Sequence, residues 1–150
     1  MNPLTLKVVA YTDKFPEIQF VRVQVYQIEQ KIAPNLVLDG KDDAAEHILA
    51  YLNNQPVGTA RIRYIDNQNA SIEKLAVLST ARRQGIGKKI MEKALEIVAQ
   101  KNVEEVVINA QEYIKTLYKQ LGFEQVGESF KKAGNPHVLI KMRKQLRQPR

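Results

Sequence analysis

The segment from Ile72 to Lys89 (IEKLAVLSTARRQGIGKK) constrains the fold of this chain more than any other. A strand-like run leads into a loop that carries Arg82, Gly85 and Gly87, and the loop enters an amphipathic helix directly. The first turn of a helix has unpaired N–H groups and a partial positive charge. Glycines let a ligand approach the backbone closely, and arginines add charge-assisted donors. This strand–loop–helix unit is therefore predicted to bind phosphate groups.

Two familiar phosphate-binding loops do not fit this segment. A Walker loop needs a glycine five residues before its Gly-Lys pair and a hydroxyl residue after it. For the pair Gly87 and Lys88, those positions hold Arg82 and Lys89. A Rossmann loop needs a third glycine at the position that Ile90 occupies here. What remains is a strand, a loop with two glycines and a long helix.

The rest of the chain alternates between strand-like and helical patterns. Strands are expected at 4–10, 47–52, 57–65, 70–77, 104–109, 124–130 and 137–143. Helices are expected from residue 16 until Pro34, at 85–100 and at 113–120; apolar residues of the first recur at Val21, Val25, Ile28 and Ile32. This order predicts an α+β fold, a mixed sheet with helices on its faces. With 150 residues, no repeat and no linker, we expect residues 1–150 to form one domain.

Composition excludes several classes of protein. The chain is 44% hydrophobic and 26% charged, as an ordinary globular domain is. It has no cysteine, which excludes disulfides, cysteine nucleophiles and thiolate metal sites. Two histidines, His47 and His137, cannot build a histidine-only metal centre, and we expect no metal. There is no membrane-spanning run and no secretory leader, so we expect a soluble, cytoplasmic protein.

The net charge of +7 is concentrated at the C-terminal end. Residues 131–150 contain seven basic residues and no acidic one, whereas charges cancel in residues 1–130. Such an end could attract nucleic acid, acidic lipid or an anionic ligand. Because no aromatic residues are interleaved with these charges to stack on bases, we expect a solvated, frayed terminus and no nucleic-acid partner.

The glycine loop at 82–87 resembles the central motif of the GNAT superfamily of acyl-CoA-dependent N-acyltransferases. That motif is arginine or glutamine, two residues, glycine, one residue, then glycine or alanine. Asn109 at the end of the next strand, and Tyr118 before a Leu-Gly-Phe turn, match two further family features in the expected order. The resemblance covers nearly the whole chain, and it implies a largely antiparallel sheet with splayed central strands and helices on both faces.

A narrower set of residues is similar to a bacterial GNAT subgroup whose substrates are poorly defined. The residues that carry this likeness are Arg22, Val25, Tyr26, Glu29, Gln30, Asp39, His47, Asn109, Ala110, Gln111, Gly134, Pro136 and His137.

The resemblance implies transfer of an acetyl group from acetyl-CoA to a primary amine of a small molecule or a protein. The pantetheine arm would lie along the strand at 75–77, and the pyrophosphate would lie on main-chain N–H groups of the loop. The implied acetyl-CoA-binding residues are Leu75, Ala76, Val77, Arg82, Arg83, Gln84, Gly85, Ile86, Gly87, Lys88, Asn109 and Tyr118. A non-catalytic acyl-CoA sensor on the same fold is the alternative.

The same resemblance implies catalytic roles. The amine attacks the thioester directly, the backbone N–H near Val77 binds the developing oxyanion, and Tyr118 protonates the leaving sulfur. Glu73 is the expected general base, directly or through water, because strand alternation places it on the face of Leu75 and Val77. His47 and His137 are its rivals, since imidazole titrates near neutral pH.

The acceptor amine is not revealed by the sequence. The fold implies a pocket built from the first helix, the following loop and the last strands, with Arg22, Tyr26 and His137 contacting the substrate. Acidic residues in the loop at 39–43 would suit a cationic amine. A homodimer is left open.

Overall fold

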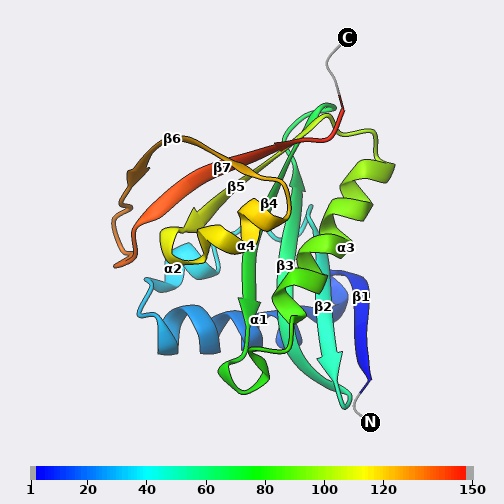
Figure 1. Cartoon of the computed structure of the whole chain (residues 1–150). Helices are drawn as coiled ribbons and strands as arrows, with labels where there is room; N and C mark the ends of the chain where they lie inside the picture. The colour runs from blue at the N-terminus through cyan, green and yellow to red at the C-terminus, as the bar shows by residue number, and fades with distance from the viewer. Residues whose placement is uncertain (1–2, 148–150) are drawn as a thin grey trace.

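The computed structural model describes residues 3–147, which form one seven-stranded sheet with helices on both faces (Figure 1). The strands are β1 (Leu4–Ala10), β2 (Glu46–Leu52), β3 (Gln55–Tyr64), β4 (Asn69–Val77), β5 (Glu105–Gln111), β6 (Glu124–Phe130) and β7 (Leu139–Gln145). The helices are α1 (Tyr11–Arg22), the π-helix η1 (Val23–Glu29), α2 (Pro34–Val37), η2 (Ser79–Ala81), α3 (Ile86–Gln100), η3 (Glu112–Ile114) and α4 (Lys115–Gln120).

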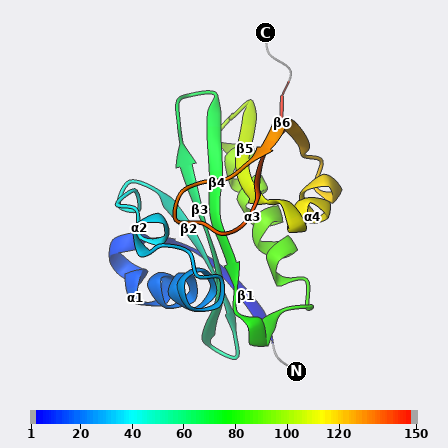
Figure 2. The ribbon, with the colours of Figure 1, turned by 90° about the vertical axis from the view of Figure 1, so that its left-hand side faces the viewer.

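The strand order is β1-β2-β3-β4-β5-β7-β6. Neighbouring strands are antiparallel except for β4 and β5, which run parallel. Helices α1 and α2 lie on one face of the sheet, and α3 and α4 lie on the other (Figure 2). The predicted architecture of a mixed, largely antiparallel sheet covered by helices on both faces is confirmed.

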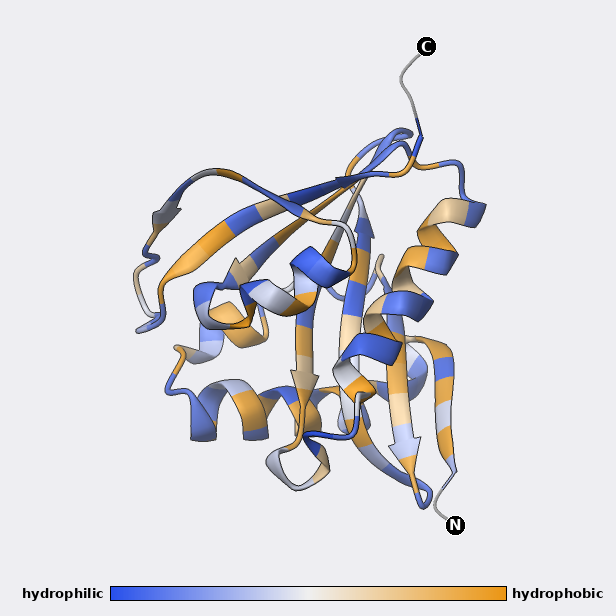
Figure 3. Cartoon of the chain, viewed as in Figure 1, coloured by the Kyte–Doolittle hydropathy of each residue, from blue (hydrophilic) through white to orange (hydrophobic). Residues whose placement is uncertain are grey.

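Helix α3 anchors the larger core through buried residues at helical spacing. Figure 3 shows hydrophobic residues alternating along α3 with hydrophilic residues. The buried members are Ile86, Ile90, Met91, Ala94, Ile97 and Val98. Gly58 of β3 permits the close approach of this helix, because a Cβ atom there would lie 2.8 Å from Cδ1 of Ile90. The start of α3 is thereby held beside the end of β4.

The first helix differs from the sequence prediction. A turn at Tyr11 precedes the expected start at Pro16, and a kink at Lys14 (φ of −135°, ψ of 23°) separates this turn from the helix that contains Pro16. From Val23 the helix winds as a π-helix, which takes more residues per turn. The wider winding moves Ile28 off the buried face, where the 3.6-residue period had placed it, and leaves it 55% exposed. Val25 stays buried. The first helix ends at Glu29, earlier than the expected end at Pro34, so Ile32 lies outside it. Pro34 opens the separate short helix α2, where its missing N–H is harmless.

The basic C-terminal segment is part of the sheet. The expectation of a frayed terminus is wrong for β7, which lies between β5 and β6. There Arg143 Nε donates to Glu124 Oε1 at 3.0 Å. Of the seven basic residues in this segment, Arg150 lies outside the residues that the structure describes. Between residues 3 and 147, no helix is long and apolar enough to cross a membrane.

Candidate active site

Strands β4 and β5 pair over one end only and then separate. Asn69–Ser71 of β4 pair with Glu105–Val107 of β5, and no further pairs follow. A cavity of about 400 Å³ opens beyond this short ladder, lined by residues of both strands. The predicted splay of the central strands is confirmed.

The cavity wall combines segments that are far apart in the sequence. Strands β4 and β5 form its floor, while the ends of η1 and α2, the β6–β7 turn and α4 form its sides. Figure 2 shows the β6–β7 turn crossing in front of β4, next to α2. The contact is direct: Ala33 N–H donates to the Gly134 carbonyl at 2.8 Å.

A β-bulge in β4 changes which side chains face the helices. Lys74 has φ of 57°, in the left-handed region, and the register passes from Arg61 opposite Glu73 to Thr59 opposite Ala76. The extra residue reverses the alternation after Glu73. The expectation that Glu73 shares a face with Leu75 and Val77 is therefore wrong; it shares a face with Ala76.

Ala76 packs against the first helix, whereas Leu75 and Val77 pack against the core under α3. Near the cavity, β4 therefore contacts the first helix through Ala76 and the core under α3 through Leu75 and Val77.

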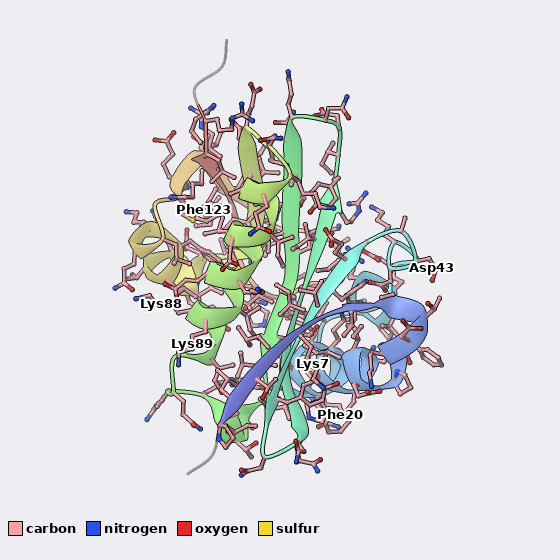
Figure 4. The ribbon with its side chains drawn as sticks, turned by 90° about the vertical axis from the view of Figure 1, so that its right-hand side faces the viewer. Lys7, Phe20, Asp43, Lys88, Lys89 and Phe123 are labelled. Atoms are coloured by element: carbon pink, nitrogen blue, oxygen red, sulfur yellow. The ribbon has the colours of Figure 1, made fainter. Side chains whose placement is uncertain are left out.

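The acidic loop after α2 is neutralised by buried arginines. Arg61 donates to both carboxylate oxygens of Asp39, at 2.7 and 2.8 Å, and to Asp42 Oδ1 at 3.1 Å. Arg22 Nη1 donates to Asp42 Oδ2 at 2.9 Å. Burial raises the pKa of each aspartate, but the arginines outweigh burial and hold both pKa values below the ordinary range. Asp43 is exposed and extends away from the molecule (Figure 4).

Glu73 joins the same cluster. Its carboxylate accepts hydrogen bonds from Arg61 at 2.6 and 2.9 Å, from Ser71 at 2.9 Å and from Arg63 at 3.2 Å. Burial raises the pKa of Glu73, and the Arg61 charge and hydrogen bonds lower it by more, so the group is ionised at neutral pH. Glu73 lines the cavity.

The two histidines do not line the cavity. His47 is fully buried, and its Nε2 hydrogen-bonds the Asp42 carbonyl oxygen at 3.0 Å. Burial lowers the pKa of His47, which favours a neutral ring. His137 has its backbone N–H bound to Asn135 Oδ1 at 2.9 Å, and its ring lies 6.2 Å from that of Tyr113.

The three expected acceptor contacts therefore do not come together. Arg22 is 0% exposed and bound to Asp42. Neither Arg22 nor His137 lines the cavity. Tyr26 does line the cavity, and its hydroxyl donates to the Leu75 carbonyl of β4. Burial raises the pKa of Tyr26, so this donor keeps its proton.

The glycine loop forms an open turn into α3. Gly85 has φ of 75° and caps the helix without a side-chain hydrogen bond, and the first turn contains no acidic residue. Arg83 also lies in the left-handed region, at φ of 64°. A Cβ atom at Gly87 would have only Val77 nearby, at 3.8 Å. Lys88 extends outward from this turn (Figure 4). The N–H groups at this helix start are available to an anion.

Arg82 does not point its side chain into the loop. Its Nε donates to the Val77 carbonyl at 3.0 Å, and its guanidinium binds both carboxylate oxygens of Glu29 at the end of η1. The Glu29 carboxylate raises the pKa of Arg82 further. This side chain ties the end of β4 to the first helix, which leaves main-chain groups for the phosphate role.

Tyr118 and Asn109 face the cavity from opposite elements. Tyr118, on α4, is 4% exposed, packs edge-on against Phe123, and makes no side-chain hydrogen bond within residues 3–147. Burial raises the pKa of Tyr118, with a smaller contribution from Tyr113. Asn109 lies on β5, which continues two residues beyond the predicted end.

Several contacts and residues that shape the site were not found by sequence reasoning. Gln111 Nε2 donates to Gln30 Oε1 at 2.6 Å, which links β5 to the end of the first helix across the cavity. Arg61, Arg63 and Lys74 also line the cavity. Two arginines within a largely buried strand, downstream of an acidic loop, were the available signal for the ion-pair cluster. Nothing in the sequence indicates the bulge at Lys74.

The described residues contain no group of three or more histidine, aspartate or glutamate side chains arranged to hold a metal ion. Two parallel strands that separate beside a helix preceded by a glycine-containing turn are the arrangement of the acyl-CoA N-acyltransferase fold. The model of the acetyltransferase (GNAT) domain family matches residues 19–146, and the chain belongs to this family.

Relatives agree with this assignment, and a solved structure shares the fold. An uncharacterized N-acetyltransferase of Bacillus subtilis, YjcF, is 31% identical over 120 residues, covering 79% of this chain and 85% of the relative. Another B. subtilis relative is 35% identical over 95 residues, which are 63% of this chain and 64% of that protein. A GNAT family acetyltransferase from Elizabethkingia anophelis, solved with acetyl-CoA bound, has a TM-score of 0.76 at 18% identity, covering 95% and 98% of the two chains.

Proposed function

We propose that the protein transfers an acetyl group from acetyl-CoA to a primary amine, with both substrates bound together. The separation of β4 from β5 after Ser71 and Val107 carries this proposal. It leaves β4 backbone groups facing a cavity in place of a neighbouring strand. An extended pantetheine arm has amide donors and acceptors that suit such an edge. The Elizabethkingia structure, solved with acetyl-CoA bound, supports acetyl-CoA as the donor.

The pyrophosphate of the donor is placed at the start of α3. Main-chain N–H groups from Arg83 to Lys88 and the positive end of the helix dipole would bind it, and the absence of any capping side chain favours this role. The pantetheine then runs along residues 75–77, with Asn109 on the opposite strand. Each charge at a helix end contributes roughly 0.3–1 kcal/mol, so several donors act together.

The reaction proposed at the inner end is direct attack of a neutral amine on the thioester carbonyl. The C–N bond forms, negative charge develops on oxygen near the N–H of Val77, and the C–S bond then breaks. Tyr118 donates its proton to the leaving sulfur, which yields the free thiol of CoA. The raised pKa of Tyr118 keeps that proton in place until the thiolate forms.

Glu73 is proposed to take the amine proton through water. Of the three candidate bases, Glu73 lines the cavity and the two histidines do not. Its lowered pKa makes it a weak base, so its main contributions are to hold a water molecule and to stabilise the emerging proton. We expect its removal to slow the reaction less than the removal of Tyr118 does.

Calorimetry with acetyl-CoA, ATP and NAD tests the donor site. We expect acetyl-CoA alone to bind, and no binding at millimolar acetyl-CoA would falsify the proposal. A panel of amines, followed by release of free CoA thiol, then tests transfer. Binding of acetyl-CoA without thiol release from any amine would instead favour a non-catalytic acyl-CoA sensor.

A further inference from the structure

The wall of the cavity carries more basic than acidic side chains. Two carboxylates line it, those of Asp39 and Glu73. The basic lining residues are Lys41, Arg61, Arg63, Lys74 and Lys132.

Both lining carboxylates are already bound by arginines. Arg61 holds Asp39 through two hydrogen bonds and Glu73 through two more, and Arg63 also contacts Glu73. The arginines and acids of this cluster offset one another in charge. The surplus positive charge of the cavity therefore belongs to its lysines.

Lys74 is the most buried of the three lysines that line the cavity. It lies on the β4 bulge and is only partly exposed, and its ammonium donates to the Leu36 carbonyl of α2. Within residues 3–147 it forms no ion pair with a carboxylate. Burial lowers the pKa of Lys74 to about 8, and the charges of Arg61 and Arg22 add to this effect while those of Asp39 and Glu73 oppose it.

Two further lysines reach the same cavity from other segments. Lys41 belongs to the loop after α2, and Lys132 belongs to the β6–β7 turn. These segments are joined, because the Gly134 carbonyl accepts from Ala33 N–H at 2.8 Å. Neither lysine forms a salt bridge to a carboxylate in the part of the chain that the structure describes. Three separate segments thus bring lysines that form no salt bridge within the described residues to one end of the cavity.

This end of the cavity is separate from the proposed phosphate site. The pyrophosphate is assigned to the first turn of α3, whereas α2 and the β6–β7 turn lie on the opposite side of β4 from α3 (Figures 1 and 2). The lysines therefore face the space left for the acceptor.

We propose that the acceptor is a small amine that also carries a carboxylate, which binds at Lys74, Lys41 and Lys132 while the amine faces the thioester. This inference rests on the proposed acetyl transfer. A cavity of about 400 Å³ falls within the usual range for small-molecule sites. The acceptor carboxylate supplies the direct salt bridge that Lys74 lacks within residues 3–147, and a purely cationic amine is disfavoured.

Binding of product analogues tests this inference independently of turnover. CoA-saturated protein is titrated by calorimetry with N-acetylglycine, N-acetyl-β-alanine and N-acetyl-γ-aminobutyrate, each beside its neutral primary amide. We expect at least one acid to bind tenfold or more tightly than its amide. Equal affinities for every acid and amide pair, tighter binding of the amides, or no binding of any acid would overturn the inference. N-acetylated phosphoethanolamine is the comparison for phosphate, and a stronger preference for it would overturn the choice of carboxylate.

Substitutions assign the preference to the lysines. Lys74→Met should remove most of the preference for acid over amide, Lys74→Arg should retain it, and Lys7→Met, on the distant edge strand β1, should leave it unchanged. Lys132→Met, on an exposed turn, is the second variant if Lys74→Met does not fold. If a folded Lys74→Met variant kept the full preference for acid over amide, Lys74 would not bind the carboxylate. The same holds for Lys132 in a folded Lys132→Met variant.

Turnover separates this inference from the proposed function. If only neutral amines release CoA, acetyl transfer stands and the carboxylate-bearing acceptor is rejected. If acids bind but no amine releases CoA, the anion site stands and acetyl transfer is rejected.

Discussion

Burial raises the pKa of Tyr118 well above its ordinary value, so its hydroxyl stays protonated across the neutral range. A group in this state holds a proton that it can donate, although burial makes it a weaker acid, and it cannot accept a proton from an ammonium. Burial also raises the pKa of Glu73, but the charge and hydrogen bonds of Arg61 outweigh burial there and lower the pKa. The two groups therefore suit opposite roles at the two ends of the reaction.

Tyr118→Phe should lower kcat by about 10²–10⁴-fold, the usual contribution of a well-placed general acid, with little change in the Kd of acetyl-CoA. Steady-state rates of thiol release, together with calorimetry, measure both quantities. Tyr51→Phe, on β2 and outside the cavity wall, is the matched control and should keep full activity. An unchanged kcat in Tyr118→Phe would reject the acid role.

Asp39→Asn tests the ion-pair cluster through its pH dependence. The folded-state pKa of Asp39 lies below its ordinary value of 3.8, so its ion pair stabilises the fold above that pH and is lost as the pH falls. Urea unfolding should show the variant less stable by about 1.5–3 kcal/mol at pH 7, the range for a hydrogen bond to a charged group.

The stability difference between wild type and Asp39→Asn should begin to shrink as the pH falls from about 5 to about 3, where a carboxylate of ordinary pKa takes up its proton in the unfolded chain. Asp43→Asn, at an exposed position of the same loop, should differ little from wild type at either pH. A difference for Asp39→Asn that stays constant with pH would show that its ion pair with Arg61 does not stabilise the fold.

At the scale of elements, the turn into α3 is set by backbone conformation. Gly85 lies at φ of 75°, where a residue with a side chain is strained, although no atom lies within 4 Å of a Cβ built there. The open space is what a bound phosphate requires. Any substitution therefore has two separable effects, on the backbone and on the ligand.

Gly85→Val should lower stability by roughly 1–2 kcal/mol through left-handed strain and should also weaken acetyl-CoA binding at least tenfold. Gly127→Val is a close control, because Gly127 has the same φ of 75° and equally open space but lies on β6. It should share the loss in Tm and retain the Kd of acetyl-CoA. If both variants keep wild-type affinity, the pyrophosphate does not bind at this turn.

The elements themselves were largely predictable, because their signals are local. The expected helix at 85–100 is observed at Ile86–Gln100, and the strand expected at 70–77 is observed at Asn69–Val77. The π-helical winding after Arg22 and the bulge at Lys74 were not predictable, since tertiary packing selects both against local preference. That single bulge is the reason why Glu73 faces a different layer from the one expected.

Within the candidate site, the sequence indicated the groups held by local geometry and missed those held by distant partners. Gly85 and Tyr118 follow from motifs that span a few residues. The neutralisation of Asp39 depends on Arg61, 22 residues away, and the burial of Lys74 depends on the segment at Leu36, 38 residues away. Spacing along the chain does not reveal such pairs.

At the scale of the whole molecule, the two halves of the sheet are joined along β4 and β5 by a ladder of three residue pairs. Past Ser71, the amides of β4 that face the cavity have no strand partner. Such amides are expected to exchange their hydrogens with solvent faster than amides in a continuous ladder. Acetyl-CoA would take the place of the missing strand.

Hydrogen–deuterium exchange should therefore show a peptide covering residues 72–77 protected on addition of acetyl-CoA. The β2–β3 hairpin, with pairs along its length, should change little and is the internal control. Protection confined to the hairpin, or none at 72–77, would place the donor elsewhere. On the proposed binding mode, the sheet is least stable along the edge that acetyl-CoA would complete, so we expect the protein to resist heat and proteolysis best when acetyl-CoA is bound.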